Sequence, residues 1–138
     1  MSGSRVKSIA FNQDAGLLAS GSKNRPFQFF VFATSTWDVV ATLTGHHEQV
    51  ESFAFSPDSG LLASGSADST VKVFATSTWD VVTTLAQHTG GVNGVAFNQG
   101  GGLLASCSED VSLHGKQRDF CLKFVFFSEK IHVSFFIV

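Results

Sequence analysis

The sequence has little of several features that would place it in other classes of protein. Its 138 residues include no tyrosine, two prolines and two cysteines, and only 14% of them are charged. Two cysteines are too few for a disulfide-stapled domain, so we expect an intracellular, reducing setting. The net charge of −2 offers no basic patch for phosphate contacts, and we therefore expect no nucleic-acid partner.

A long apolar run is also missing. A membrane-spanning helix needs about 20 mostly apolar residues, whereas charged residues such as Lys123 and Glu129 interrupt the Phe-rich end of the chain. The first residues, Met1 to Ser8, contain no apolar stretch typical of a secretory signal. We expect a cytoplasmic protein without a membrane partner.

Internal repetition is the strongest pattern that is present. Leu-Leu-Ala-Ser occurs at residues 17–20, 61–64 and 103–106, and Thr-Ser-Thr-Trp-Asp-Val-Val occurs at residues 34–40 and 76–82. The copies are offset by 44 and 42 residues, a period typical of repeat architectures. Such near-identity indicates recent duplication of one structural unit.

Each copy is predicted to contain four short strands. In the second copy they cover about residues 49–55, 61–66, 70–75 and 79–85, which are rich in Val, Phe and Thr. Turn signals such as Ser56-Pro-Asp-Ser-Gly60 separate them, and no stretch of ten residues has helical periodicity. Four antiparallel strands every 42 residues or so describe one blade of an all-β propeller.

The motifs of the second copy resemble those of the WD-repeat β-propeller family. They are Gly45-His46, the stretch from Val50 to Asp58, and the stretch from Leu61 to Phe74. The resemblance covers residues 5–110 and implies a partial propeller with two complete four-stranded blades and a half or improvised third. The implied blades lie at about residues 5–45, 46–87 and 88–110.

The resemblance also implies a structural hydrogen-bond set of His, Ser, Asp and Trp in each blade. The matching residues are His46, Ser64 and Asp68 in the second copy and His88, Ser106 and Asp110 in the third. The first copy has no preceding His, and Lys23-Asn24 stand where its Asp is expected.

The Trp of that set is expected to be absent. The dipeptides Trp37-Asp38 and Trp79-Asp80 follow the Thr-Ser-Thr turn, so they lie at the start of a predicted fourth strand. Aligned with the family, the Trp position falls on Phe74, which has no N–H to donate. Phe11, Phe53, Phe55, Phe74 and Phe97 occupy strand positions, and we expect them to pack between blades.

No combination of residues predicts catalysis. Ser, His and Asp are the components of a hydrolase triad, but Ser64 lies in a predicted strand and no Gly-x-Ser-x-Gly turn is present. His46 and His47 are adjacent and point to opposite faces of the chain, and Cys107 and Cys121 lack metal-ligand spacing. We expect no enzyme activity, no catalytic residue, no metal and no cofactor.

The resemblance favours a non-catalytic scaffold for protein–protein interaction, because loops on one face of such propellers typically bind proteins or peptides. The corresponding candidate residues here are Lys23, Asn24, Arg25, His47, Glu48, Gln49, Ser69 and Thr89. Three alternatives remain open. The chain is a repeat array from a larger signalling or sensor protein, a truncated product without its own function, or, least favoured, a hydrolase.

The repeat pattern stops after Asp110. Residues 111–138 contain six of the 15 Phe residues, and they lack the third strand that the pattern requires next. Val111-Ser112 matches a translated intron start, so one hypothesis is a retained intron; the other is a β-hairpin that completes the third blade. Open blade faces further predict self-association or a longer parent propeller.

Overall fold

The computed structural model of the chain is built from three four-stranded antiparallel sheets. The structure describes residues 5–111, 118–127 and 131–137, and the side chains of residues 5–108. In this part of the chain, no helix is long and apolar enough to cross a membrane. The all-β class predicted from the repeats is confirmed.

The strands follow one another in each sheet in the order of the chain. Blade 1 contains β1 (Val6–Phe11), β2 (Leu17–Ser22), β3 (Phe29–Ala33) and β4 (Val39–Leu43). Blade 2 contains β5 (Val50–Phe55), β6 (Leu61–Ser66), β7 (Val71–Ala75) and β8 (Val81–Leu85). Blade 3 contains β9 (Val92–Phe97), β10 (Leu103–Val111), β11 (Arg118–Phe127) and β12 (Ile131–Ile137).

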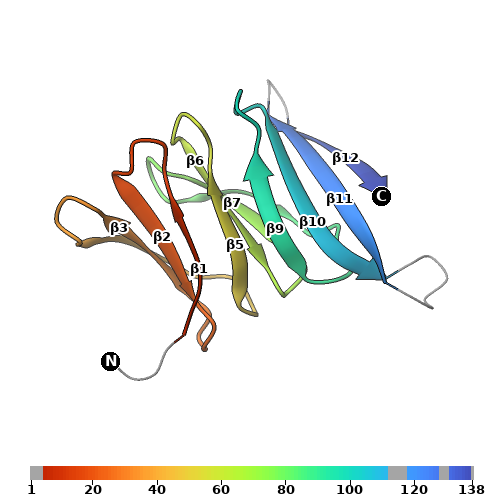
Figure 1. Cartoon of the computed structure of the whole chain (residues 1–138), viewed down its shortest axis with the longest axis horizontal. Helices are drawn as coiled ribbons and strands as arrows, with labels where there is room; N and C mark the ends of the chain where they lie inside the picture. Colours follow the sequence, from red (N-terminus) through yellow and green to blue (C-terminus); the bar gives the residue numbers. More distant parts are fainter. Residues whose placement is uncertain (1–4, 112–117, 128–130, 138) are drawn as a thin grey trace.

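Blades 1 and 2 are complete, and the strands of blade 2 lie within two residues of their predicted bounds. In blade 3, β10 pairs with β11 and β11 pairs with β12. The third and fourth strands of this four-stranded sheet thus come from the tail after Asp110, which does not follow the repeat pattern. Figure 1 shows the three sheets standing side by side in an open row, with blade 2 in the middle. The first strands of neighbouring blades contact one another: β5 of blade 2 contacts both β1 of blade 1 and β9 of blade 3.

The hydrophobic core consists of two separate layers between neighbouring blades. Successive residues of a strand point to opposite faces of the sheet, so Leu62 of β6 packs toward blade 1 while Ala63 packs toward blade 3. The first layer contains Ala19, Phe29, Val31, Leu43, Val50, Phe53, Leu62 and Phe74. The second contains Ala63, Val71, Val73, Val92, Val95 and Leu104.

Aromatic rings fill the centre of the first layer. Phe29 of blade 1 lies 4.8 Å from Phe53 and 5.5 Å from Phe74 between ring centroids, the latter pair edge to face. The expected packing between blades is thus found for Phe53 and Phe74, both buried. For Phe11 the prediction is wrong: its ring is exposed, because blade 1 has no blade against its other face in the described part of the chain.

Candidate functional site

The predicted loop residues gather at one end of the blades, on a surface that we call the loop rim (residues 22–28, 44–49, 67–70 and 86–91). Ser66 at the end of β6 donates its hydroxyl to the carbonyls of Glu48 and Gln49, at 3.1 and 3.0 Å. Ala67 N–H donates to the Gln49 carbonyl at 3.0 Å. These bonds fix the loop before β5 against the turn after β6.

The predicted candidate residues of the loop rim are mostly exposed and carry both charges. Gln49 and Ser69 are half-buried. The exposed members are Lys23, Asn24, Arg25, His47, Glu48 and Thr89. The guanidinium of Arg25 also lies over the ring of Phe27, 5.5 Å from its centroid. The surface therefore offers polar and charged groups on a framework whose backbone is tied to the blades.

Where the loop rim meets β6, the structure brings His46, Ser64 and Asp68 of blade 2 together. His46 Nε2 lies 2.7 Å from Ser64 Oγ, and His46 Nδ1 lies 3.0 Å from Asp68 Oδ2. Asp68 also accepts the backbone N–H of His47 at 2.9 Å and that of Thr70 at 2.9 Å. The set joins the loop before β5, the strand β6 and the turn after β6.

The electrostatics of this set define its proton positions. Burial lowers the pKa of His46, and its hydrogen bond to Asp68 only partly offsets that effect, so the imidazole is neutral at neutral pH. Burial would raise the pKa of Asp68, but hydrogen bonds from Thr70, His47 N–H and His46 lower it to about 2. The ionised carboxylate accepts from Nδ1–H, and Nε2 then accepts from the Ser64 hydroxyl.

In the other two blades, fewer members of this hydrogen-bond set are observed. In blade 3, His88 Nε2 lies 2.8 Å from Ser106 Oγ, both buried. Asp110 belongs to β10, but its side chain lies outside the described residues. In blade 1, the turn at Lys23-Asn24 keeps the backbone bonds of blade 2: Lys23 N–H donates to the Arg5 carbonyl at 2.8 Å, and Asn24 N–H donates to Ser22 Oγ at 3.1 Å. Ala67 N–H and Asp68 N–H make the equivalent bonds in blade 2.

The two Trp-Asp dipeptides lie in turns, away from the hydrogen-bond set. Trp37 and Trp79 each have a φ near +60° and donate their N–H to the carbonyls of Ala33 and Ala75 at 2.6 Å. Phe74 instead occupies the end of β7, almost fully buried against Phe29. The aromatic residue at the family's Trp position thus contributes packing and no hydrogen bond.

Two residues of the rim framework were not anticipated from the sequence. Ser66 and Ser108 are both buried, and each donates to a carbonyl of the preceding loop, Ser108 to Gly90 at 2.9 Å. The signal that could have found them is the repeat itself, since each follows the predicted Ser64 or Ser106 by two residues. An inward position two residues along the same strand has the same orientation.

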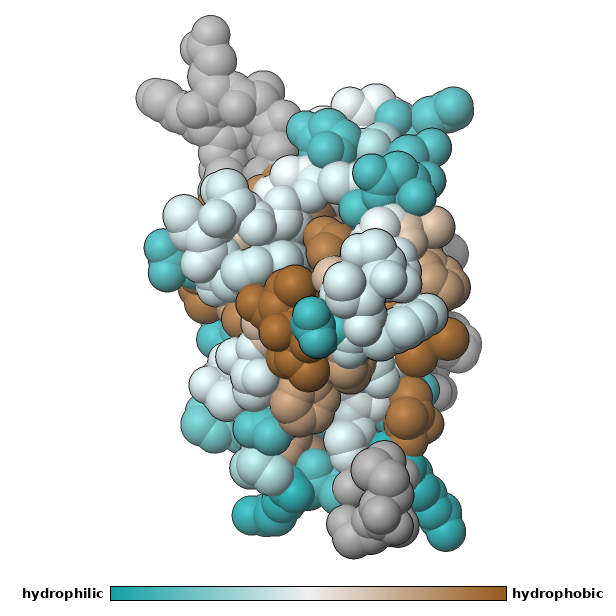
Figure 2. Space-filling view, turned by 90° about the vertical axis from the view of Figure 1, so that its left-hand side faces the viewer, coloured by the Kyte–Doolittle hydropathy of each residue, from teal (hydrophilic) through white to brown (hydrophobic). Residues whose placement is uncertain are grey.

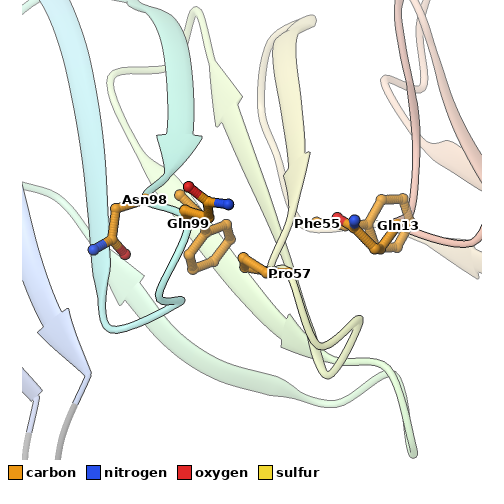
Figure 3. A pocket seen from close by; sticks show the side chains of 6 residues that line it. Gln13, Phe55, Pro57, Asn98 and Gln99 are labelled. Atoms are coloured by element: carbon orange, nitrogen blue, oxygen red, sulfur yellow. The ribbon is translucent and has the colours of Figure 1, made fainter.

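The opposite end of the blades has a hollow of about 570 Å³. It is lined by Gln13, Phe55, Pro57, Phe97, Asn98 and Gln99. Phe55 and Phe97 are the last residues of β5 and β9, and Figure 3 shows the other side chains on the turns that follow β1, β5 and β9. None of them is charged, and no group of three or more His, Cys, Asp or Glu that could hold a metal occurs within the described residues.

Three adjoining four-stranded sheets with apolar layers between them define a repeat protein of the β-propeller class. The family model for the WD domain, G-beta repeat, matches residues 37–75 and 79–110, more than half of the chain. The chain belongs to the WD40 repeat family. Each matched segment begins before the outer strand of one blade and reaches into the inner strands of the next.

Solved structures with the same fold include those titled "Structure of U3-55K" (TM-score 0.83, 19% identity) and "Crystal structure of RRP9 WD40 repeats" (0.84, 19%). They align with all of this chain, which covers 41% and 40% of theirs. The Cps50 (Swd1) beta-propeller domain of Myceliophteria thermophila matches 96% of this chain and is covered to 39% (TM-score 0.75, 18% identity). This chain thus spans about two fifths of these structures. No curated protein matches it.

Proposed function

We propose that the chain is a non-catalytic scaffold whose loop rim binds a protein or peptide partner. The observation that carries this proposal is the rim itself. It has exposed charges of both signs, and hydrogen bonds fix the backbone of its loops to the blades. Family membership supports it, since WD40 repeats typically mediate protein–protein contacts. A polar rim over a rigid scaffold is also where binding residues are commonly found.

A hydrolytic role for the His46 set has less support. The order Ser64 hydroxyl, His46, Asp68 has the connectivity of a catalytic triad. However, Ser64 is fully buried in the middle of a strand, between β5 and β7. A nucleophile must reach the carbonyl that it attacks, and Ser64 has no path to a substrate. We therefore assign the set the structural role of locking the loop to the blade.

The experiment for the rim is affinity capture with two matched charge reversals. Glu48→Lys changes the rim, and Asp80→Lys makes the same change in the exposed turn before β8, at the other end of blade 2. Partners recovered with the wild type and with Asp80→Lys should be lost with Glu48→Lys, while all three proteins melt alike. Equal recovery by both variants would remove the rim from the binding surface.

A second candidate is that the chain is part of a longer propeller or of a repeat array in a larger signalling protein. It is favoured by the identity of residues 34–40 and 76–82, which form the same turn with the same hydrogen bonds in blades 1 and 2. Sequencing the transcript across codons 100–140 tests it. A spliced form that continues the repeat after Asp110, or a reading frame that extends upstream of Met1, supports the longer protein. A transcript whose reading frame starts at Met1 and stops after Val138 contradicts it.

A further inference from the structure

The hollow at the end of the blades opposite the loop rim lies where the first strand of each blade ends. Because β5 contacts both β1 and β9, the turns that follow these three strands meet at one place. Gln13, Pro57 and Gln99 occupy the same position in the three copies of the repeat, and all three line the hollow. Figure 3 shows the lining side chains spread across the blades, with Pro57 between Gln13 and Gln99. The repeat thus builds one hollow that crosses all three blades.

Two amide side chains of the hollow are available to a ligand. Gln13 and Gln99 are exposed, and neither side chain makes a hydrogen bond to another group in the described part of the chain. A primary amide has two N–H donors and a carbonyl acceptor, and each residue of a peptide backbone also has a donor and an acceptor. A cation alone would use only the carbonyls, and an anion alone only the N–H groups. The two amides therefore match the backbone of an extended peptide.

The apolar part of the hollow is held rigidly by the blades. Phe55 packs against the first apolar layer and Phe97 against the second, so both rings are half-buried. Pro57 is half-buried as well. A few polar groups placed around apolar and aromatic side chains are typical of ligand sites, whose volumes are about 300–1,000 Å³. The hollow of about 570 Å³ is within this range and offers room for an apolar side chain.

The two ends of the blades differ in the sign of their charges. On the side of blade 1, Figure 2 shows hydrophilic side chains toward both ends and hydrophobic ones between them. The five Lys and Arg residues with described side chains all lie at the rim end: Arg5, Lys7, Lys23, Arg25 and Lys72. The described turns at the hollow's end have no Lys, Arg or His and four aspartates: Asp14, Asp38, Asp58 and Asp80. This end therefore attracts cationic ligands and repels anionic ones.

Two of these aspartates belong to the turns that line the hollow. Asp14 and Asp58 each directly follow a lining residue, and both are exposed. Their Oδ1 atoms accept N–H bonds within the turn, from Gly16 at 2.9 Å and from Gly60 at 2.8 Å. A hydrogen bond from Ser56 also lowers the pKa of Asp58. The second oxygen of each carboxylate binds no other group in the described part of the chain, so both can accept from a cationic side chain.

We propose that this hollow binds an extended peptide segment of a basic partner. An apolar side chain of the segment lies against Phe55 and Phe97, and its backbone makes hydrogen bonds with the amides of Gln13 and Gln99. A neighbouring Lys or Arg of the segment lies against the carboxylates of the two lining turns. The site is at the opposite end of the blades from the loop rim and is independent of the proposed function of the rim.

The probe for this site is a library of random dodecapeptides displayed on phage and selected on the immobilised full chain. Enriched peptides should combine apolar residues with Lys or Arg, and their binding should weaken as the salt concentration rises. Fluorescence anisotropy then gives the dissociation constant of a synthetic enriched peptide. Gln99→Arg places a bulky cation in the hollow and should weaken binding by about tenfold or more. Asn93→Arg, the same kind of change at an exposed position of β9 outside the hollow, should not weaken it.

A second hollow variant keeps the test valid if one substitution disturbs folding. Gln13→Arg makes the same change on blade 1 and should weaken binding of the same peptide. Thermal melts check that each variant is folded. An enriched peptide that both hollow variants bind as the wild type does would overturn the proposal, as would a library from which no peptide is enriched.

The charges are tested with two matched double variants. Asp14→Asn with Asp58→Asn removes two charges beside the hollow and keeps the Oδ1 acceptors of the turns. Asp38→Asn with Asp80→Asn removes two charges from exposed turns at the same end that do not line the hollow. The first pair should weaken binding by about 2- to 30-fold, the range for two exposed ion pairs, and the second by less. Equal losses, or enriched peptides that are acidic or uncharged, would contradict a basic partner at this site.

Discussion

At the scale of single residues, the buried hydrogen bonds of His46 decide how blade 2 responds to acid. His46 donates its Nδ1–H to the Asp68 carboxylate and accepts the Ser64 hydroxyl at Nε2, an arrangement that only the neutral ring can make. A second proton on Nε2 would face the Ser64 hydroxyl and remove its acceptor. The set therefore acts as a lock whose strength depends on protonation.

The pH dependence of stability follows from these shifts. Both His46 and Asp68 have a folded-state pKa below the ordinary values of 6.5 and 3.8, the latter at about 2. The unfolded chain thus binds more protons, so stability is complete above the ordinary pKa and is lost as the pH falls. We expect the melting temperature to fall below pH 6.5 through His46, and to fall further between pH 3.8 and about 2 through Asp68.

His46→Gln is the variant that tests this assignment, with His47→Gln as its control on the exposed neighbour. His46→Gln should melt at a lower temperature at neutral pH and should show a flatter decline below pH 6.5. His47→Gln should decline as the wild type does. An unchanged decline in His46→Gln would assign the acid sensitivity to other groups.

The aromatic at the end of β7 has a larger role in stability than the Trp-Asp dipeptides. Phe74→Ala should lower the free energy of unfolding by about 3–5 kcal/mol, because a buried ring is replaced by a cavity. Trp37→Ala should change it by no more than about 0.5 kcal/mol, because Trp37 is an exposed turn residue. Denaturant unfolding measures both, and similar losses would contradict the placement of Phe74 at the packing position.

At the scale of strands, a glycine in β6 controls how closely blades 2 and 3 approach. Gly65→Ala should destabilise the chain by about 1–3 kcal/mol, because its Cβ would overlap with Val92. Gly100→Ala in the turn before β10 is the matched control, since its Cβ would meet only Asn98 at 3.7 Å, an ordinary contact. Thermal melts compare the two, and a neutral Gly65→Ala would mean that the blades separate without cost.

The strands were more predictable from the sequence than the contacts between them. The repeat marks where each strand of blade 2 begins and ends because a turn signal recurs at a fixed position in every copy. The close contact of Gly65 with Val92 could not be predicted, because glycine within a strand equally indicates a bulge. Its cause is a second sheet, which no local pattern describes.

The residues of the hydrogen-bond set were likewise predictable, whereas the exposure of a face was not. The resemblance nominated His46, Ser64 and Asp68, and the structure brings them together because a loop, a strand end and a turn meet at one end of the blade. The exposure of Phe11 could not be foreseen, because its neighbour depends on the number of blades rather than on its own strand. Pattern identifies which face is apolar, but not whether that face is covered.

At the scale of the whole molecule, the three blades differ in how much of their surface is covered. The strands β2 and β6 have the same six residues, Leu-Leu-Ala-Ser-Gly-Ser, each preceded by glycine. Nevertheless, β6 is buried at five of its six positions, whereas β2 is buried at two. Identical sequence thus exists in two environments within one chain, and the difference is the second neighbour of blade 2.

This provides an internal comparison for hydrogen exchange. Amide protons of β6 should exchange more slowly than those of β2, because opening β6 disturbs both apolar layers. Intrinsic exchange rates are matched by the identical sequences, so NMR can compare the pairs directly in dilute protein. Equal protection in dilute protein would show that blade coverage does not set local stability.

The offset between the matched family segments and the sheets has a consequence for how such genes change. Each segment contributes the outer strand of one blade and inner strands of the following one. A duplication or deletion of one whole segment therefore leaves every sheet with four strands, because the outer strand at the start of a segment completes the sheet begun by the segment before it. Insertions or deletions one repeat long can therefore lengthen or shorten the array while each new junction reuses a contact that already exists, so the number of blades can vary readily in evolution.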